Sequence, residues 1–193
     1  MDSMATPTAS KPSTITVRPA RSQDVTYIRE LVRPYAEQRI LLEKEAVAYY
    51  EALQEFRVAE DADGRIIGCG AFHVMWEDIG EIRTLAVHPD AAGQGCGGLL
   101  LEHLLQDARQ LGIHRVFCLT FEVDFFKKHG FEVMDQQDAV APEVFQELLR
   151  SHDDGVAEFL DLARVKQNTL GNTRMITTLS DVEERITPLV SQE

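Results

Sequence analysis

The sequence has few cysteines, little positive charge and no long apolar run, and each shortage excludes a class of protein. Its three cysteines in 193 residues lie far apart and match no zinc or thioredoxin spacing, which favours a reducing compartment. The net charge of -13 opposes binding to nucleic acid or to anionic membranes. No segment approaches the roughly 18 apolar residues of a membrane span, and the N-terminus lacks the apolar core of a signal peptide. We therefore expect a cytoplasmic protein.

The histidines are also scarce and scattered. Six histidines in the whole chain form no metal-ligand spacing, so we expect no metal. An anionic ligand of so acidic a protein must then be captured locally, by backbone amides or by a few well-placed cations.

What the chain does contain suffices for one packed domain, since 44% of its residues are hydrophobic and 26% are charged. Residues 1–14 predict a flexible tail, residues 15–179 the folded domain, and residues 180–193 a peripheral C-terminal tail. Helical and strand periodicities alternate, which predicts a mixed α/β (α+β) fold. Strands are expected at 15–18, 56–60, 65–74, 81–87, 115–120, 131–134 and 173–179. Helices are expected after Asp24 as N-cap, with Pro34 bending or ending that helix, and at 46–53, 98–111, 124–129 and 142–150, while 156–166 is ambiguous.

A glycine-rich loop lies between the strand 81–87 and the helix 98–111. Glycines without a Cβ let successive N–H groups approach a phosphate, and the helix N-terminus adds a partial positive charge. Gly93, Gly95 and Gly98 also fit the G-x-G-x-x-G spacing of dinucleotide sites, with Glu122 as a ribose-binding acid. That pattern belongs directly after the first strand of a sheet, whereas several strands come earlier here, so we favour a different kind of pyrophosphate loop.

The segments EIRTLAVHPDAAGQGCGGLLLEHLL and FFKKHGFEV resemble the GNAT acetyltransferase superfamily, and the resemblance covers roughly residues 15–134. It implies a central, mainly antiparallel sheet that splays at the coenzyme site, with helices on both faces, and acetyl-CoA as cosubstrate. The family's loop pattern Q/R-x-x-G-x-G/A maps onto Ala92 to Gly97, with Ala92 in place of the usual Arg or Gln. The residues implied to bind the coenzyme through this loop are Gln94, Gly95, Cys96, Gly97 and Gly98. Phe126 and Lys128 lie farther along its path, where Lys128 is expected to attract the 3′-phosphate.

The chain is also similar to the acetyltransferase domain of bacterial N-acetylglutamate synthases. The similarity extends from DVTYIRELVRP through ILLEKE, GEIRTLAVHP and VFCLT to FFKKHGF. No amino-acid-kinase domain precedes these motifs, so the resemblance is to the short, stand-alone type. It implies acetylation of the α-amino group of L-glutamate or L-glutamine, which is the first step of arginine biosynthesis.

Acetyl transfer needs a deprotonated amine, a polarised thioester carbonyl and help for the leaving thiolate. The resemblance places the base at Glu81, acting through water, although a solvated charge at a strand end is the alternative. It places the oxyanion donors in the N–H groups of Leu85, Ala86 and Val87. Phe126 and its neighbour stand where many relatives carry a general-acid tyrosine, so Thr120 is the substitute, against the alternative of a threonine that only caps its strand.

An amino-acid acceptor carries a carboxylate, for which an acidic protein must supply a dedicated cation. The candidates are Lys44, in the segment that resembles the acceptor-binding stretch of the synthases, Arg83, on the same strand face as Glu81, and Arg174. Relatives place an arginine where Glu43 stands, so glutamine rivals glutamate as acceptor.

Three other functions stay open at this stage. One is an acetyltransferase for another amine, such as an antibiotic, a polyamine or a protein N-terminus, since acidic clefts suit polycations. The second is a non-catalytic module that binds coenzyme A, and the third is a nicotinamide-dependent oxidoreductase. A homodimer is also possible.

Overall fold

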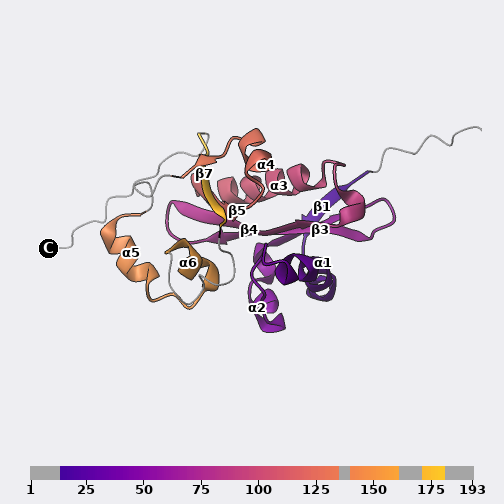
Figure 1. Ribbon diagram of the computed structural model, residues 1–193, viewed down its shortest axis with the longest axis horizontal. Coiled ribbons are helices and arrows are strands. Elements are labelled where there is room, and N and C mark those ends of the chain that lie inside the picture. Colours follow the sequence, from indigo (N-terminus) through magenta and orange to yellow (C-terminus); the bar gives the residue numbers. More distant parts are fainter. Residues whose placement is uncertain (1–13, 135–139, 161–170, 181–193) are drawn as a thin grey trace, which may run out of the picture.

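Seven strands form one sheet in the order β1-β2-β3-β4-β5-β7-β6 in the computed structural model of the protein, which describes residues 14–134, 140–160 and 171–180 (Figure 1). The neighbouring strands of this sheet are antiparallel except for β4 and β5, which are parallel. The strands are β1 Thr16–Pro19, β2 Phe56–Glu60, β3 Ile66–Val74, β4 Ile79–Val87, β5 Arg115–Thr120, β6 Glu132–Val133 and β7 Thr173–Thr178. The expected mixed, mainly antiparallel sheet is confirmed.

Helices cover both faces of this sheet, as expected (Figure 1). Helices α3 and α4 lie on one face, and α1, α2 and α6 lie on the other. The helices are α1 Val25–Glu37, α2 Ala46–Glu51, α3 Cys96–Gln110, α4 Val123–Lys128, α5 Pro142–Leu148 and α6 Asp154–Phe159. Because β4 and β5 are parallel, the chain must cross over between them, and α3 provides this crossover.

Helix α3 is held on the sheet by one apolar face. Leu100, Leu101, Leu104 and Ala108 recur at helical spacing and are all 0% exposed. Burial of each leucine side chain contributes about 1.5–3 kcal/mol, so these residues fix the helix against the sheet. The helix begins at Cys96, two residues before the expected start, and Gly112 follows it with a φ of 76°, as expected of a C′ glycine.

The sheet splays between β4 and β5. Their pairing covers only Ile79 to Ile82 of β4, so the remainder of that strand has no partner on the β5 side. On the β3 side, Thr84 and Leu85 stand opposite the single residue Gly70, which forms a β-bulge, and Thr84 has a φ of 56°. A Cβ at Gly70 would lie 2.8 Å from a Leu104 methyl and 3.0 Å from one of Leu85, so a larger residue there would require these leucine side chains to shift. The bulge turns the end of β4 away from β5 and leaves its backbone accessible.

The start and end of α1 differ from what local sequence predicts. The helix begins directly after Asp24, but the Asp24 carboxylate makes no cap to the helix. It accepts hydrogen bonds from the Arg21 N–H (2.7 Å) and from Arg18 Nη1 (2.7 Å), which tie β1 to the turn before the helix. Pro34 does not end α1, which continues to Glu37. The last turn is anchored by tertiary contact, because the Tyr35 hydroxyl donates to the Val87 carbonyl at 2.5 Å.

The C-terminal third contains the remaining differences. The ambiguous stretch 156–166 contains the end of helix α6, which begins earlier, at Asp154; residues 161–166 lie outside the described part of the chain. The two tails also fall almost wholly outside it, so the proposed domain limits stay a prediction.

Candidate active site

The glycine loop presents unpaired backbone amides at the start of α3. Gly93 and Gly95 have φ angles of 75° and 82°, a region that glycine enters without strain, and Gly95 is the N-cap residue of α3. The first helical hydrogen bond of the i→i−4 type runs from the Leu99 N–H to the Gly95 carbonyl at 3.0 Å. The N–H groups of Cys96, Gly97 and Gly98 therefore precede the helical ladder and are oriented to bind an anion.

Gln94 lies differently from the four residues that follow it. Its N–H approaches the Ala91 carbonyl at 3.3 Å, and its side-chain amide donates to the Asp90 carbonyl at 2.8 Å. These bonds close the turn before the loop. Gln94 therefore shapes the loop, and its own contact with the coenzyme stays a prediction.

Helix α4 packs against the glycine loop. A Cβ at Gly98 would lie 3.0 Å from His129 Nε2, and one at Gly97 would lie 3.5 Å from the Phe125 ring. Phe126 is 5% exposed and belongs to the core beneath α3, whereas Lys128 is exposed in the last turn of α4. Coenzyme contacts of these last two residues stay predictions, and the burial of Phe126 gives it a packing role in any case.

Glu81 is a buried carboxylate at the splayed edge. It is 3% exposed, which rules out the alternative of a solvated charge. Its Oε2 atom has no hydrogen-bond partner in the described part of the chain and lies 3.8 Å from Arg83 Nε. Burial raises the pKa of Glu81, while the charges of Arg83 and Lys44 lower it. A carboxylate with a raised pKa is a stronger base than an exposed one.

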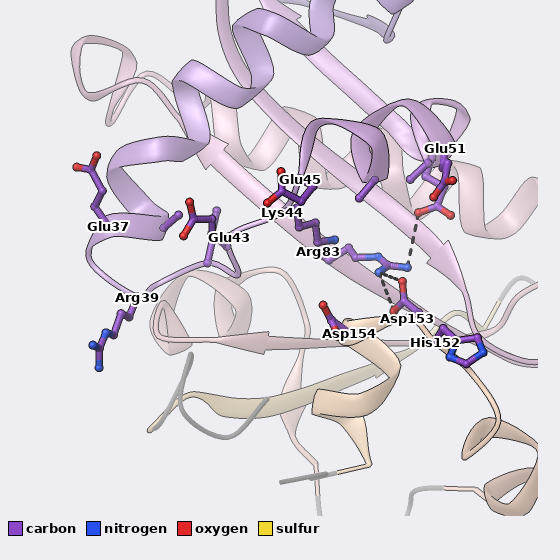
Figure 2. Close-up of a pocket in the computed structure, with 15 residues that line it drawn as sticks. Glu37, Arg39, Glu43, Lys44, Glu45, Glu51, Arg83, His152, Asp153 and Asp154 are labelled. Atoms are coloured by element: carbon purple, nitrogen blue, oxygen red, sulfur yellow. Dashed lines mark hydrogen bonds and ion pairs between the residues drawn. The ribbon is translucent and has the colours of Figure 1, made fainter. Parts of the chain in front are cut away.

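Glu81 stands beside a cleft that joins three parts of the chain. The cleft has a volume of about 940 Å³ and is lined by residues between 36 and 55, from the end of α1 to just past α2, by Arg83 of β4 and by residues 152–154 at the start of α6 (Figure 2). Lys44 and Arg83, both expected to bind the acceptor, line it and lie close together. The third expected cation, Arg174, is not among its lining residues.

The two cations in the cleft have different environments. Arg83 Nη1 donates to both carboxylate oxygens of Asp153, at 3.0 and 2.9 Å, and Arg83 also lies 3.7 Å from Glu55. No hydrogen bond or ion pair joins Lys44 to any described residue. Burial, and then the charge of Arg83, lowers the pKa of Lys44. Lys44 is therefore the cation of this pair that is available to a ligand.

Asp153 was missed in the sequence, although part of its role is visible there. Its carboxylate accepts from the Val156 N–H at 2.9 Å, which is an N-cap of α6, and an aspartate before an apolar helical stretch predicts that cap. Its contact with Arg83, 70 positions earlier, leaves no local signal. The same holds for Glu55, which pairs with His73 Nδ1 at 2.7 Å.

Thr120 and Arg174 occupy the far side of the splay. Thr120 is 8% exposed, and its hydroxyl oxygen accepts from the Glu122 N–H at 2.8 Å, as expected for a threonine that caps a strand end. Arg174 on β7 donates to the Glu158 carbonyl at 3.1 Å. Burial raises the pKa of the Glu158 carboxyl to about 7, although a hydrogen bond from Asn172 lowers it. Arg174 thus braces α6 against β7.

A sheet that splays after its fourth strand, with a glycine loop leading into the crossover helix, defines a class of coenzyme A-dependent acyltransferases. The model of the acetyltransferase (GNAT) family matches residues 25–131, and the chain belongs to this family. The expected membership is confirmed.

Two relatives resemble the chain over most of the matched region. An amino-acid acetyltransferase of Mycobacterium tuberculosis is 54% identical over 165 residues, which are 84% of this chain and 94% of that protein. An amino-acid acetyltransferase of Neisseria meningitidis is 36% identical over 130 residues, 66% of this chain. This chain spans only 30% of the length of that second relative.

Solved structures agree with this assignment. The crystal structure of Rv2747 from Mycobacterium tuberculosis, in complex with CoA and a second ligand, superposes with a TM-score of 0.81 and 54% identity, covering 85% of this chain and 99% of that one. The N-acetylglutamate synthase of Neisseria gonorrhoeae, complexed with coenzyme A and N-acetyl-glutamate, gives a TM-score of 0.68 and 28% identity over 86% of this chain and 35% of that one. Among the helices of the described residues, none is long and apolar enough to cross a membrane.

Proposed function

We propose that this chain transfers the acetyl group of acetyl-CoA to the α-amino group of L-glutamine or L-glutamate. The enzyme class is acetyl-CoA-dependent amino-acid N-acetyltransferase, to which the relatives with 54% and 36% identity also belong. The observation that carries the proposal is the buried Glu81 beside a cleft in which Lys44 has no partner among the described residues. A buried base 3.8 Å from the lining residue Arg83, and the cation Lys44 in the cleft itself, suit an acceptor that carries both an amine and a carboxylate.

The coenzyme is bound mainly by backbone groups in this proposal. The amides of Cys96, Gly97 and Gly98 bind its pyrophosphate at the start of α3, with the help of the helix dipole. The splay between β4 and β5 then receives the thioester end, because β4 beyond Ile82 has no partner on that side.

The reaction needs three proton movements and one exchange of bonds. Glu81, through water, takes a proton from the acceptor ammonium, and the freed amine attacks the thioester carbonyl carbon. A C–N bond forms, the C–S bond breaks, and backbone N–H groups between Leu85 and Val87 stabilise the oxyanion between these events. The attacking nitrogen loses its second proton as the C–S bond breaks, and the leaving thiolate takes up a proton. The Thr120 hydroxyl is the proposed hydrogen-bond donor to the thiolate, and its oxygen accepts from the Glu122 N–H.

A second acceptor class has an observation in its favour. Among the residues that the structure describes, seven carboxylates line the cleft against Arg39, Lys44, Arg83 and one histidine, so a polyamine would also be attracted to it. A polyamine, however, offers no carboxylate to Lys44.

The test is release of free thiol from acetyl-CoA, measured as kcat/KM over L-glutamine, L-glutamate, other amino acids and polyamines. We expect turnover with glutamine or glutamate and little with spermidine. Turnover with polyamines alone would replace the proposal, and no turnover with any amine would leave a protein that only binds coenzyme A.

Two further parts of the proposal concern the cell. We place the enzyme in the cytoplasm, in line with its three free, buried cysteines, and we propose a homodimer. Size-exclusion chromatography with light scattering tests the second point.

A further inference from the structure

Asp153 is the carboxylate that binds Arg83 most closely in the cleft. Both of its oxygens accept from Arg83 Nη1, at 3.0 and 2.9 Å, and the Arg83 side chain is 9% exposed (Figure 2). Glu55 at 3.7 Å and Glu81 at 3.8 Å complete the surroundings of the same guanidinium. Three carboxylates therefore surround one arginine, so the single positive charge of Arg83 is already compensated before an acceptor binds.

The position of Asp153 is fixed from both sides. Its side chain caps α6 through the Val156 N–H at 2.9 Å, and its own N–H donates to the Ser151 hydroxyl at 3.1 Å. The next turn is closely packed against these side chains, because a Cβ at the buried Gly155 would lie 2.9 Å from Glu81 Oε2 and 3.0 Å from both Arg83 Nη1 and Asp153 Oδ1. The carboxylate is thus built into the wall of the cleft, next to the catalytic base.

The rest of the cleft cannot compensate a second negative charge. Lys44 points into it with no partner among the described residues, whereas Arg39 is exposed and its side chain points away from Arg83 (Figure 2). The described residues of the lining carry seven carboxylates. One acceptor carboxylate pairs with Lys44, and a second one meets Asp153 and its neighbours at close range, where like charges repel strongly.

We infer that Asp153 is a specificity-determining residue that neutralises Arg83 and so disfavours acceptors with a second carboxylate. The inference rests on the proposed function, which supplies an amino acid as acceptor. Removal of the Asp153 charge frees Arg83 to bind a side-chain carboxylate, so glutamate gains relative to glutamine.

The experiment compares kcat/KM for L-glutamate and for L-glutamine in the wild-type protein, in Asp153→Asn and in Asp153→Ser. Both variants keep a side chain that caps α6 but remove the charge, and a thermal melt checks folding. We expect the glutamate-to-glutamine ratio to rise about tenfold, through a lower KM for glutamate. Glu45→Gln removes the same charge from the exposed rim of the cleft and is expected to change the ratio by less than about twofold.

A second comparison, between two acceptors, uses only the wild-type protein. L-glutamate γ-methyl ester has the shape of glutamate without the second charge, and we expect a KM lower than that of glutamate. An unchanged glutamate-to-glutamine ratio in both Asp153 variants of an active enzyme overturns the role of Asp153 but not the proposed function. An equal effect of Glu45→Gln does the same. A wild-type protein inactive with all three acceptors overturns the proposed function and this inference with it.

Discussion

The glycine loop and the cleft are built in opposite ways, although both lie next to strand β4. The loop consists of consecutive residues, 93–98, and acts through backbone amides at the start of α3. The cleft takes its charged side chains from positions as far apart as Lys44, Arg83 and Asp153. We therefore expect coenzyme binding to tolerate side-chain changes such as Ala92 in place of Arg or Gln, and we expect single charges to change the acceptor preference of the cleft.

The largest expected effect comes from Glu81, where the two regions meet. Glu81→Gln should lower kcat by about 10²–10⁴, the usual contribution of a general base. Because burial raises the pKa of Glu81, wild-type kcat/KM should rise with pH until the carboxyl has ionised, and this rising limb should vanish in the variant. A pH series of thiol release measures both. Glu102→Gln, an exposed change on α3, is the control, and equal rates for the two variants would remove Glu81 from catalysis.

Loss of the Lys44 charge should come next. Lys44→Gln should raise the KM for the amino acid by about 10–100-fold, as expected for a lost hydrogen bond to a charged group, with the Kd for coenzyme A unchanged. Steady-state kinetics and calorimetry separate these two constants. Arg39→Gln removes a cation from the rim of the same cleft and should have a much smaller effect. A similar KM in both variants would mean that the acceptor carboxylate does not pair with Lys44.

The backbone of the loop is tested by Gly95→Ala. An alanine at a φ of 82° is strained by about 1–2 kcal/mol, and relief of this strain turns the following amides away from the phosphate. We expect the Kd for coenzyme A to rise about three- to tenfold, measured by calorimetry. Gly112→Ala imposes similar strain at the other end of α3, with a φ of 76°, and should cost stability without changing that Kd. Equal Kd values would show that the loop conformation is unimportant for binding.

The smallest effect concerns the brace between α6 and β7. The pKa of Glu158 is raised from 4.5 to about 7, so its stabilising contribution is present below pH 4.5 and is lost as the pH rises through 7. Glu158→Gln keeps the acceptor for Asn172 and removes the charge, so the variant should melt about 2–4 °C higher than wild type at pH 8 and show little gain at pH 5. Thermal melts at the two pH values measure this. The exposed change Glu147→Gln should shift neither, and a lower melting temperature of Glu158→Gln at pH 8 would contradict the assignment.

Most of the helices and strands could be predicted from the sequence because they depend on local patterns of residues. The strand 56–60 and the strand 115–120 were predicted at their observed limits, and the helix after the glycine loop was predicted within two residues. Of the two expected effects of Pro34, the ending of the helix is wrong, because tertiary contacts of α1, including the bond from Tyr35 to Val87, keep the helix intact past the proline. Helix α6 was ambiguous because it has few apolar residues, and two of them, Val156 and Phe159, are buried by distant residues such as Phe117.

The sequence by itself determined the alternation of helices and strands, the anion-binding loop and the presence of Glu81 and Arg83 on one strand face, because each depends on spacing within a few residues. Only the tertiary structure decided that Glu81 is buried, that Asp153 pairs with Arg83 and that Lys44 forms no hydrogen bond or ion pair with a described residue. Those three facts depend on which residues meet across the cleft, and at separations of 39 positions between Lys44 and Arg83 and 70 between Arg83 and Asp153, the chain carries no local trace of such contacts.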